Sequence, residues 1–250
     1  MSIGPLPPTA GAAGEAGLHS EEALNISEAT FQRIRELIVH GKLAPGSRVV
    51  EADVANRLDV SRTPVRAALH RLQQEGYIRV IAGSGSKAKL VIAPLTQEDA
   101  KELYSIVARI DGLSARAAAQ VDSQTRGRLI TRLLELNSRL RDLATAGRGD
   151  PNVIFDLDIN FHQAIVDAGG GPRLRALHAA IKPQTERYWR LYASSILDQL
   201  GLSVGEHVMI VESIARGNAD AAECAMQTNW ENGAERLSSV IASLGERGSW

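Results

Sequence analysis

The segment VSRTPVRAALHRLQQEGYI, residues 60–78, decides the fold of the first part of this chain. Val65, Leu69 and Leu72 recur at helical spacing, which predicts a helix with one buried face. Pro64 suits the first turn of such a helix, because the N–H that proline lacks would have no partner there. The segment therefore predicts a short amphipathic helix that begins close to Pro64.

The opposite face of this helix carries two arginines close to its N-terminus. Arg62 and Arg66 are one turn apart, and the segment holds no acidic residue before Glu75. Positive charge is unfavourable at a helix N-terminus, because that end of the helix macrodipole is itself positive. We therefore expect a partner outside the helix to explain the two arginines.

The residues on either side predict a small unit of helices and a hairpin. A first helix is expected to end before Gly41, followed by an extended piece at 48–50 and a second short helix. After the quoted segment, two strands are expected near 77–82 and 88–93, joined by a tip rich in glycine and serine. Three helices followed by a basic β-hairpin are typical of a winged helix-turn-helix domain.

The charge of the chain is unevenly distributed, although its formal net charge is only −1. Residues 31–90 contain 11 Lys and Arg against 5 Asp and Glu. Residues 1–30 contain 4 Glu and neither Lys nor Arg, and the rest of the chain is also slightly acidic. A near-neutral total therefore conceals one basic module, which is a hint of a nucleic-acid partner.

From residue 94 onward the pattern is helical, with no strand signal. Pro94 and Thr96 are expected to begin the first helix. Further helices are expected at about 124–147, 151–168, 172–198, 203–217 and 219–244, with glycine-containing breaks between them. The predicted fold class is mainly α: an N-terminal winged helix-turn-helix followed by an all-α helical bundle.

Composition sets the remaining limits. The chain has one cysteine, so no intramolecular disulfide can form, and no apolar run reaches the ~20 residues of a membrane-spanning helix. The N-terminus lacks the basic and apolar regions of a signal peptide. We expect a soluble, cytoplasmic protein with a disordered tail at 1–22, a DNA-binding domain at 23–93 and a helical domain at 94–250.

A helix-turn-helix explains the two arginines. Its second helix lies in the major groove with its N-terminal residues against base edges. Arg62 and Arg66 could then bond bidentately to guanine, and the hydroxyls of Ser61 and Thr63 suit phosphate oxygens. The simpler alternative, that the arginines form a solvated face, is less favoured because the preceding helix and the basic hairpin also point to DNA.

The helical region contains a possible metal site. Asp158 and His162 are four residues apart, a spacing that can present two ligands to one ion. His207 and Asn229 lie in the helices expected further along. The alternative is an ordinary helix pair, with His207 as a partly buried polar residue.

The basic module also resembles a known family. The sequence IRELIVHGKLAPGSRVVEADVANRLDVSRTPVRAALHRLQQEGYI is similar to the winged domain of GntR-type bacterial transcription regulators, in its LAPG turn and its SRTPVR helix start. The family usually has Gly where Asp59 stands, and Asp tolerates a left-handed conformation better than most residues. The resemblance and the reasoning above give the expected DNA-contacting residues as Arg48, Ser61, Arg62, Thr63, Arg66, Gly85 and Lys87.

The helical region resembles the FCD ligand-binding domain of the FadR branch of that family, in ELYSIVARIDGLSARAAA, DINFHQAI and EHVMIVESIARGNADAAECAM. Many members hold a divalent metal through one Asp and three His. The resemblance implies that Asp158, His162 and His207 are ligands of a zinc, nickel or manganese ion, in the pocket that receives the effector. The fourth histidine is replaced by Asn229, whose amide oxygen is a weaker ligand than imidazole. Val107 stands where many members carry an arginine, and Asp111 where they usually have Glu.

These observations lead to one expected function. The chain is expected to be a transcriptional regulator, not an enzyme, that binds a pseudo-palindromic operator as a homodimer. The resemblance suggests a repressor whose DNA affinity depends on a small metabolite, such as an organic or sugar acid. Two alternatives are a metalloenzyme that uses the Asp158, His162 and His207 site, and an architectural DNA binder whose helical domain ignores effectors.

Overall fold

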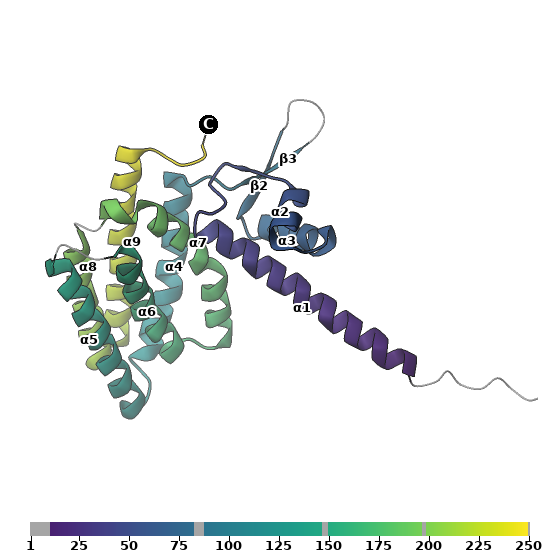
Figure 1. Ribbon diagram of the computed structural model, residues 1–250. Coiled ribbons are helices and arrows are strands. Elements are labelled where there is room, and N and C mark those ends of the chain that lie inside the picture. The colour runs from purple at the N-terminus through teal and green to yellow at the C-terminus, as the bar shows by residue number, and fades with distance from the viewer. Residues whose placement is uncertain (1–10, 83–87, 147–149, 197–198, 250) are drawn as a thin grey trace, which may run out of the picture. The chain divides into compact units, whose positions relative to one another are not determined.

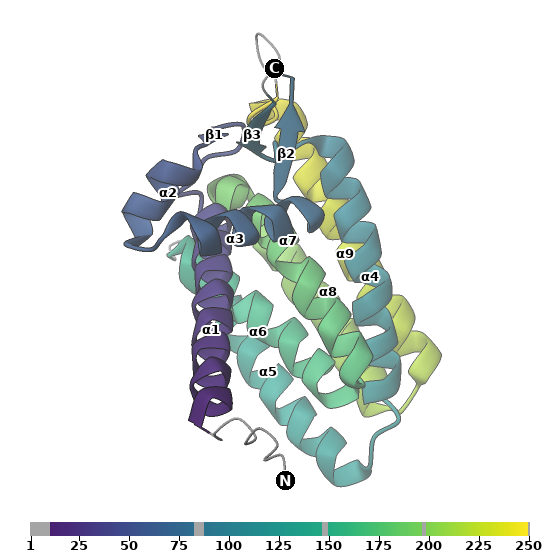
Figure 2. The same cartoon turned by 90° about the vertical axis from the view of Figure 1, so that its right-hand side faces the viewer.

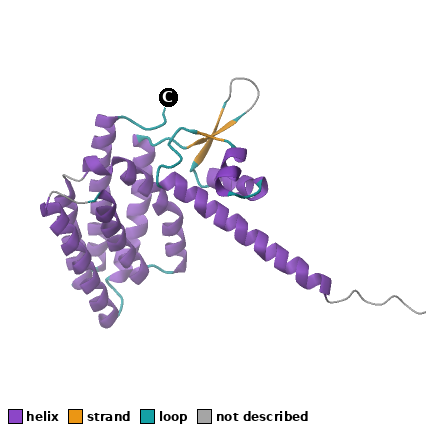
Figure 3. Ribbon diagram, in the orientation of Figure 1, coloured by secondary structure: helices purple, strands orange, loops and turns teal. Residues whose placement is uncertain are grey.

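A computed structural model describes residues 11–82, 88–146, 150–196 and 199–249 of the chain. The fold class is mainly α, as the sequence predicted, with a small sheet in the N-terminal part (Figure 3). The chain divides into two compact units. One comprises the chain up to Ile38 together with Ser47–Ala93, and the other comprises Val39–Gly46 and the chain from Pro94 onward.

The first unit is a winged helix-turn-helix (Figure 1). Its elements are α1 Gly11–Val39, β1 Arg48–Val49, α2 Glu51–Leu58, α3 Arg62–Gln74, β2 Ile78–Ile81 and β3 Lys89–Ile92. The strands form an antiparallel sheet in the order β1-β3-β2, in which Ile78 pairs with Ile92 and Arg48 with Val91. The predicted hairpin and the extended piece before α2 therefore belong to one sheet.

A small apolar core holds this unit together. Val65, Leu69 and Leu72 of α3 are buried, as their helical spacing predicts, and they share the core with Phe31 and Ile34 of α1. The turn between α2 and α3 passes through Asp59, whose backbone is left-handed at φ 54° and ψ 48°. Aspartate occupies this conformation at modest cost, so the usual glycine is dispensable here.

Helix α1 begins at Gly11, within the segment that was expected to be a disordered tail through residue 22. Its sequence GAAGEAGLHSEEALN is rich in alanine and glutamate. Both residue types have high helix propensity, which offsets the glycines of this segment.

The second unit is an all-α bundle (Figure 2). Its helices are α4 Gln97–Ala118, α5 Ser123–Ala146, α6 Pro151–Gly169, α7 Pro172–Ile196, α8 Leu200–Ala215 and α9 Ala219–Leu244. Caps fix several of the starts: the side chain of Thr96 accepts a hydrogen bond from the Asp99 N–H, and those of Asp150 and Asn218 cap α6 and α9.

Helix α4 lies at the centre of this bundle and packs against α6, α7, α8 and α9. At the end of α6 the backbones come so close that a Cβ atom at Gly169 would lie 2.0 Å from the carbonyl oxygen of Ser114. Only glycine permits this approach. The close packing brings polar residues of α4 and α6 into one interior, where the candidate site lies.

None of the described helices is both long and apolar enough to cross a membrane.

Candidate functional site

The N-terminal end of α3 exposes a group of polar side chains. Ser61 is the N-cap residue, although its side chain makes no capping hydrogen bond, and the side chains of Ser61, Arg62 and Thr63 are exposed. Arg48 is exposed on β1 of the same unit. These hydroxyl and guanidinium groups are therefore free to face a ligand outside the protein.

Arg66 is held by the carboxylate of Glu51, fifteen residues earlier in the chain. Its Nε donates to Glu51 Oε1 at 3.1 Å, and its Nη2 donates to Glu51 Oε2 at 3.0 Å. The guanidinium lowers the pKa of Glu51, mainly through these hydrogen bonds. The Arg66 side chain remains 71% exposed in this ion pair. The two hydrogen bonds therefore orient the guanidinium without burying it.

Two of the expected DNA-contacting residues, Gly85 and Lys87, lie outside the described residues, in the segment between β2 and β3. Lys89, beside this segment, is the first residue of β3.

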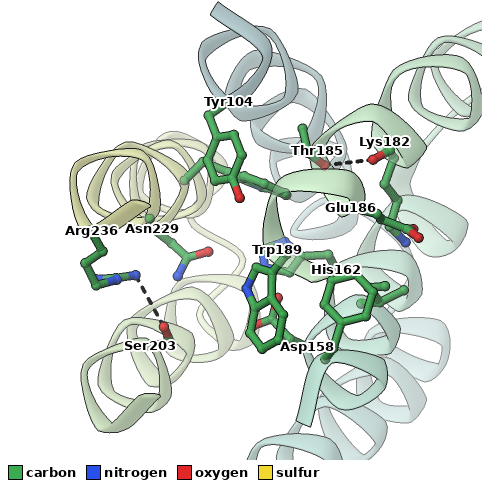
Figure 4. A pocket seen from close by; sticks show the side chains of 14 residues that line it. Tyr104, Asp158, His162, Lys182, Thr185, Glu186, Trp189, Ser203, Asn229 and Arg236 are labelled. Atoms are coloured by element: carbon green, nitrogen blue, oxygen red, sulfur yellow. Dashed lines mark hydrogen bonds between the residues drawn. The ribbon is translucent and has the colours of Figure 1, made fainter. Parts of the chain in front are cut away.

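The second unit contains an interior pocket of about 70 Å³ (Figure 4). Residues from all of its helices except α5 line the pocket. They are Tyr104, Phe155, Asp158, Ile159, His162, Lys182, Thr185, Glu186, Trp189, Ser203, Asn229, Trp230, Gly233 and Arg236. Aromatic walls with a few converging polar groups are typical of a small-molecule site.

The structure brings three of the predicted metal ligands together. One donor atom each from Asp158, His162 and His207 lies within 4.8 Å of the other two. His207 Nε2 is 3.5 Å from Asp158 Oδ1. Asp158 and His162 come from the same face of α6, as their spacing predicts, whereas His207 comes from α8.

The hydrogen bonds of His207 define which of its nitrogens carries the proton. The Asn137 amide donates to the Val204 carbonyl at 3.1 Å, so Asn137 Oδ1 is left to accept from His207 Nδ1 at 3.2 Å. His207 Nε2 then carries a lone pair toward Asp158, and it has no hydrogen-bond partner among the described residues. Two facing lone pairs are a position for a cation.

Burial determines the electrostatics of this cluster. Burial lowers the pKa of His207 well below the ordinary histidine value, so its ring is neutral at physiological pH. Burial also raises the pKa of Asp158, because the protein replaces the water that would solvate its charge. The His207 ring is fixed by stacking on Phe161, with centroids 3.8 Å apart.

A buried carboxylate lies behind His162. Asp111 of α4 is fully buried, and its Oδ2 accepts a hydrogen bond from Trp230 Nε1 at 2.9 Å. Its two oxygens also lie 3.3 Å from His162 Nδ1 and 3.4 Å from His178 Nε2. A carboxylate in this position orients a histidine so that the other ring nitrogen faces a metal.

Asn229, the residue at the position of the fourth histidine, lines the same pocket. Its amide nitrogen donates to Glu206 Oε2 at 2.7 Å, which leaves its carbonyl oxygen for another partner. Glu206 also accepts two hydrogen bonds from Arg236, at 2.7 and 3.0 Å. These contacts give Asn229 a fixed orientation in the pocket wall.

Several residues of the site carry no functional signal in the sequence. Tyr104, Lys182 and Trp230 line the pocket, and His178 is buried beside Asp111. Their helical spacing marks them only as inward-facing positions, which are usually core. Their role depends on which residues of other helices they face, and sequence periodicity carries no signal for that.

The fold and the pocket define a class of protein: a transcription regulator with a DNA-binding winged domain and a ligand-binding helical domain. The family model for the FCD domain matches residues 102–232, and the model for bacterial regulatory proteins of the gntR family matches residues 26–87. The chain belongs to the GntR family of bacterial transcription regulators and carries an FCD domain.

Relatives of similar length extend this result. An HTH-type transcriptional regulator from an unstable DNA locus of Streptomyces ambofaciens is 29% identical over 199 residues, covering 80% of this chain and 79% of the relative. The HTH-type transcriptional repressor RspR of Escherichia coli is 24% identical, covering 86% and 90%. Members of this class are DNA-binding regulators and not enzymes, so the metalloenzyme alternative is set aside.

Solved structures share the fold. McbR/YncC of Escherichia coli superimposes with a TM-score of 0.65 at 17% identity, covering 86% of this chain and 97% of that one. A GntR-type regulator from Rhodococcus gives a TM-score of 0.61 at 21% identity, covering 84% and 96%.

Proposed function

We propose that this chain is an effector-responsive repressor that binds a pseudo-palindromic operator as a homodimer. The observation that carries the proposal is the interior pocket, whose wall includes Asp158, together with the neutral, buried His207, which directs an unpartnered lone pair toward Asp158. An unpaired buried nitrogen lowers the stability of the fold. A helical domain that served only as a scaffold would gain nothing from it, whereas a binding domain would use it to hold a ligand.

The DNA contacts belong to the proposal. Arg62 and Arg66 are proposed to read base edges, and Ser61, Thr63 and Arg48 to bind phosphates. The same role is proposed for Gly85 and Lys87, which lie outside the described residues. Residues 23–93 thus serve as the DNA-binding domain and 94–250 as the effector domain, which also dimerises, because two half-sites require two recognition helices.

Repression is proposed from the relatives. RspR of Escherichia coli and NanR of Citrobacter rodentium are both named transcriptional repressors, and NanR is 23% identical over 226 residues. Effector binding in the helical domain would change the relative stability of two dimer geometries with different DNA affinity.

The residues present fit a divalent metal. His207 Nε2 and the Asp158 carboxylate face each other without a donor between them, and His162 is oriented by Asp111 from behind. Asp158, His162 and His207 would hold a zinc, nickel or manganese ion, with the Asn229 carbonyl oxygen as a weaker fourth ligand. A bound ion would supply a positive centre for an oxygen atom of the effector.

The metal proposal is tested by elemental mass spectrometry of the purified, untagged protein. Near-stoichiometric metal is expected in the wild type and in Asp156→Ala, which removes an exposed carboxylate from the same helix. Asp158→Ala should lose the metal. Equal metal content in the two variants, or no metal after incubation with zinc, manganese and nickel, would refute the site.

The regulatory proposal needs a separate test. A DNA fragment selected from random sequence by repeated binding to the wild type would serve as the operator. Its affinity for the metal-loaded protein is then measured with and without small organic acids. An unchanged affinity in the presence of a bound acid would favour the architectural DNA binder.

A further inference from the structure

Tyr104 of α4 presents an unused hydroxyl group to the pocket. Its side chain is only 5% exposed, and in Figure 4 its hydroxyl points into the space that Asn229 also faces. Tyr104 Oη has no hydrogen bond to any described residue, whereas a buried tyrosine hydroxyl normally has a partner. Burial and the charge of Asp158 raise the pKa of Tyr104, so the hydroxyl keeps its proton.

The ring that carries this hydroxyl is held in place. Trp230 meets it edge-on, with centroids 5.3 Å apart and an interplanar angle of 79°. Trp230 is itself fixed by its hydrogen bond to Asp111. On another side the ring packs close to Gly233, where a Cβ atom would be at ordinary contact distance, 3.7 Å from Tyr104 Cε1. The hydroxyl is therefore preorganised by packing that does not involve the oxygen.

Both cationic side chains that line the pocket, Arg236 and Lys182, lie close to carboxylates of the protein. Arg236 donates two hydrogen bonds to Glu206. Lys182 donates to Gln163 at 3.3 Å, and among its neighbouring charges the carboxylate of Glu186 acts on it most strongly. A second anionic group on a ligand would find no uncompensated cation here, whereas a neutral oxygen would find the Tyr104 hydroxyl.

The size of the pocket limits the ligand. The pocket volume of about 70 Å³ corresponds to roughly two or three waters at their liquid volume of about 30 Å³ each. This space suits a short acid, with its alkyl part against the aromatic walls.

We propose that Tyr104 selects effectors that carry a hydroxyl group in addition to one carboxylate. In the metal-loaded protein the carboxylate would bind at the ion held by Asp158, His162 and His207, and the ligand hydroxyl would bond to Tyr104 Oη. The ligand class is therefore a short monocarboxylic hydroxy acid. This inference rests on the proposed function in one respect: the molecule that binds in this pocket is taken to be the effector.

The test compares matched acids on matched variants. Binding of lactate and propionate, and of 3-hydroxybutyrate and butyrate, is measured by calorimetry on metal-loaded wild type, Tyr104→Phe and Tyr192→Phe. Tyr192 is the control, because its buried hydroxyl donates to the Gly245 carbonyl at 2.9 Å and it does not line the pocket. The fluorescence of Trp189 and Trp230 provides a second readout of binding.

In the wild type, at least one hydroxy acid should bind about tenfold to a hundredfold more tightly than its deoxy partner, the range expected for one hydrogen bond in a buried site. Tyr104→Phe should abolish this preference while metal content and operator affinity without acid stay unchanged. Tyr192→Phe should keep the preference. A merely structural role would lower the affinity for both acids equally.

Three results would overturn the inference: no binding of either hydroxy acid, a preference that survives in Tyr104→Phe, or a preference that Tyr192→Phe also loses. The proposed function fails differently. If the acids bind with the expected dependence on Tyr104 but operator affinity does not change, the ligand assignment stands and the regulatory role does not.

Discussion

The two functional regions of this molecule use polar groups in opposite ways. The residues at the start of α3 are exposed, and the one arginine held in place, Arg66, is oriented by a surface carboxylate. In the helical unit, Asp111 and His207 are fully buried behind the pocket wall, and each lies against several polar neighbours. Exposed charges can be changed with little effect on folding, whereas buried ones connect ligand binding to stability.

The largest effect is expected from removing the exposed arginines. Each bidentate contact of arginine with guanine is worth about 1–3 kcal/mol, so Arg62→Ala with Arg66→Ala should weaken operator binding by about a hundredfold or more. The free energy of unfolding should change little, by about 0.5 kcal/mol per site. Fluorescence anisotropy with a selected operator and urea denaturation measure the two quantities.

Arg132→Ala with Arg139→Ala is the matched control, because it removes two exposed arginines from α5 in the other unit. It should leave operator affinity unchanged. Equal losses in the two double variants would mean that overall charge, and not the position of α3, determines DNA binding.

A smaller effect is expected from completing the ligand set in the pocket. Asn229→His replaces a neutral amide oxygen with an imidazole, which should raise zinc affinity on the order of tenfold. Competition with a chromophoric chelator measures the change. Asn232→His is the control, because Asn232 also donates to Glu206 but does not line the pocket. An unchanged affinity in Asn229→His would show that position 229 lies outside the coordination sphere.

The stability of the metal-free protein should depend on pH through its buried histidines. Burial lowers the pKa of His178 and His207 below the ordinary value of 6.5. Below that pH the unfolded chain takes up protons that the folded chain does not. The free energy of unfolding should therefore be highest above pH 6.5 and fall as the pH decreases, by up to about 1.4 kcal/mol per pH unit for each histidine.

Urea denaturation at pH 7.5, 6.5 and 5.5 in the presence of a chelator measures this slope. His178→Gln should reduce it, and His70→Gln, on the exposed face of α3, is the matched control. A slope that is the same in the wild type and in His178→Gln would contradict a neutral, buried His178.

The smallest effect is expected at the carboxylate that orients Arg66. Glu51→Gln removes a negative charge close to the proposed DNA surface and loosens the arginine. An exposed ion pair contributes about 0–1 kcal/mol, so binding to random DNA should rise a few-fold while the ratio of operator to random affinity falls. Asp53→Asn, also in the first turn of α2, is the control for charge alone. The same fall in both variants would show that Glu51 acts only through its charge.

Local patterns allowed much of the fold to be predicted. The helices expected near 151–168 and 219–244 are observed at Pro151–Gly169 and Ala219–Leu244, because their caps, glycine breaks and apolar spacing are all encoded within a few residues. The unexpected helix before residue 23 shows the limit of composition, since alanine and glutamate outweighed the glycines there.

The candidate site was predictable only in part. The spacing of Asp158 and His162 placed both on one helix face, and resemblance added His207. The groups that support them are far apart in sequence: Trp230 and Asp111 are separated by 119 residues, and His207 and Asn137 by 70. No local pattern reports such a contact.

The sequence alone thus determined the elements of this protein, its basic recognition helix and the family to which it belongs. The tertiary structure alone decided that Glu51 orients Arg66, that Asp111 supports His162 and that the hydroxyl of Tyr104 faces the pocket. The reason is physical. Helices and caps form from interactions between near neighbours, whereas the partner of a buried polar group is chosen by how whole helices pack.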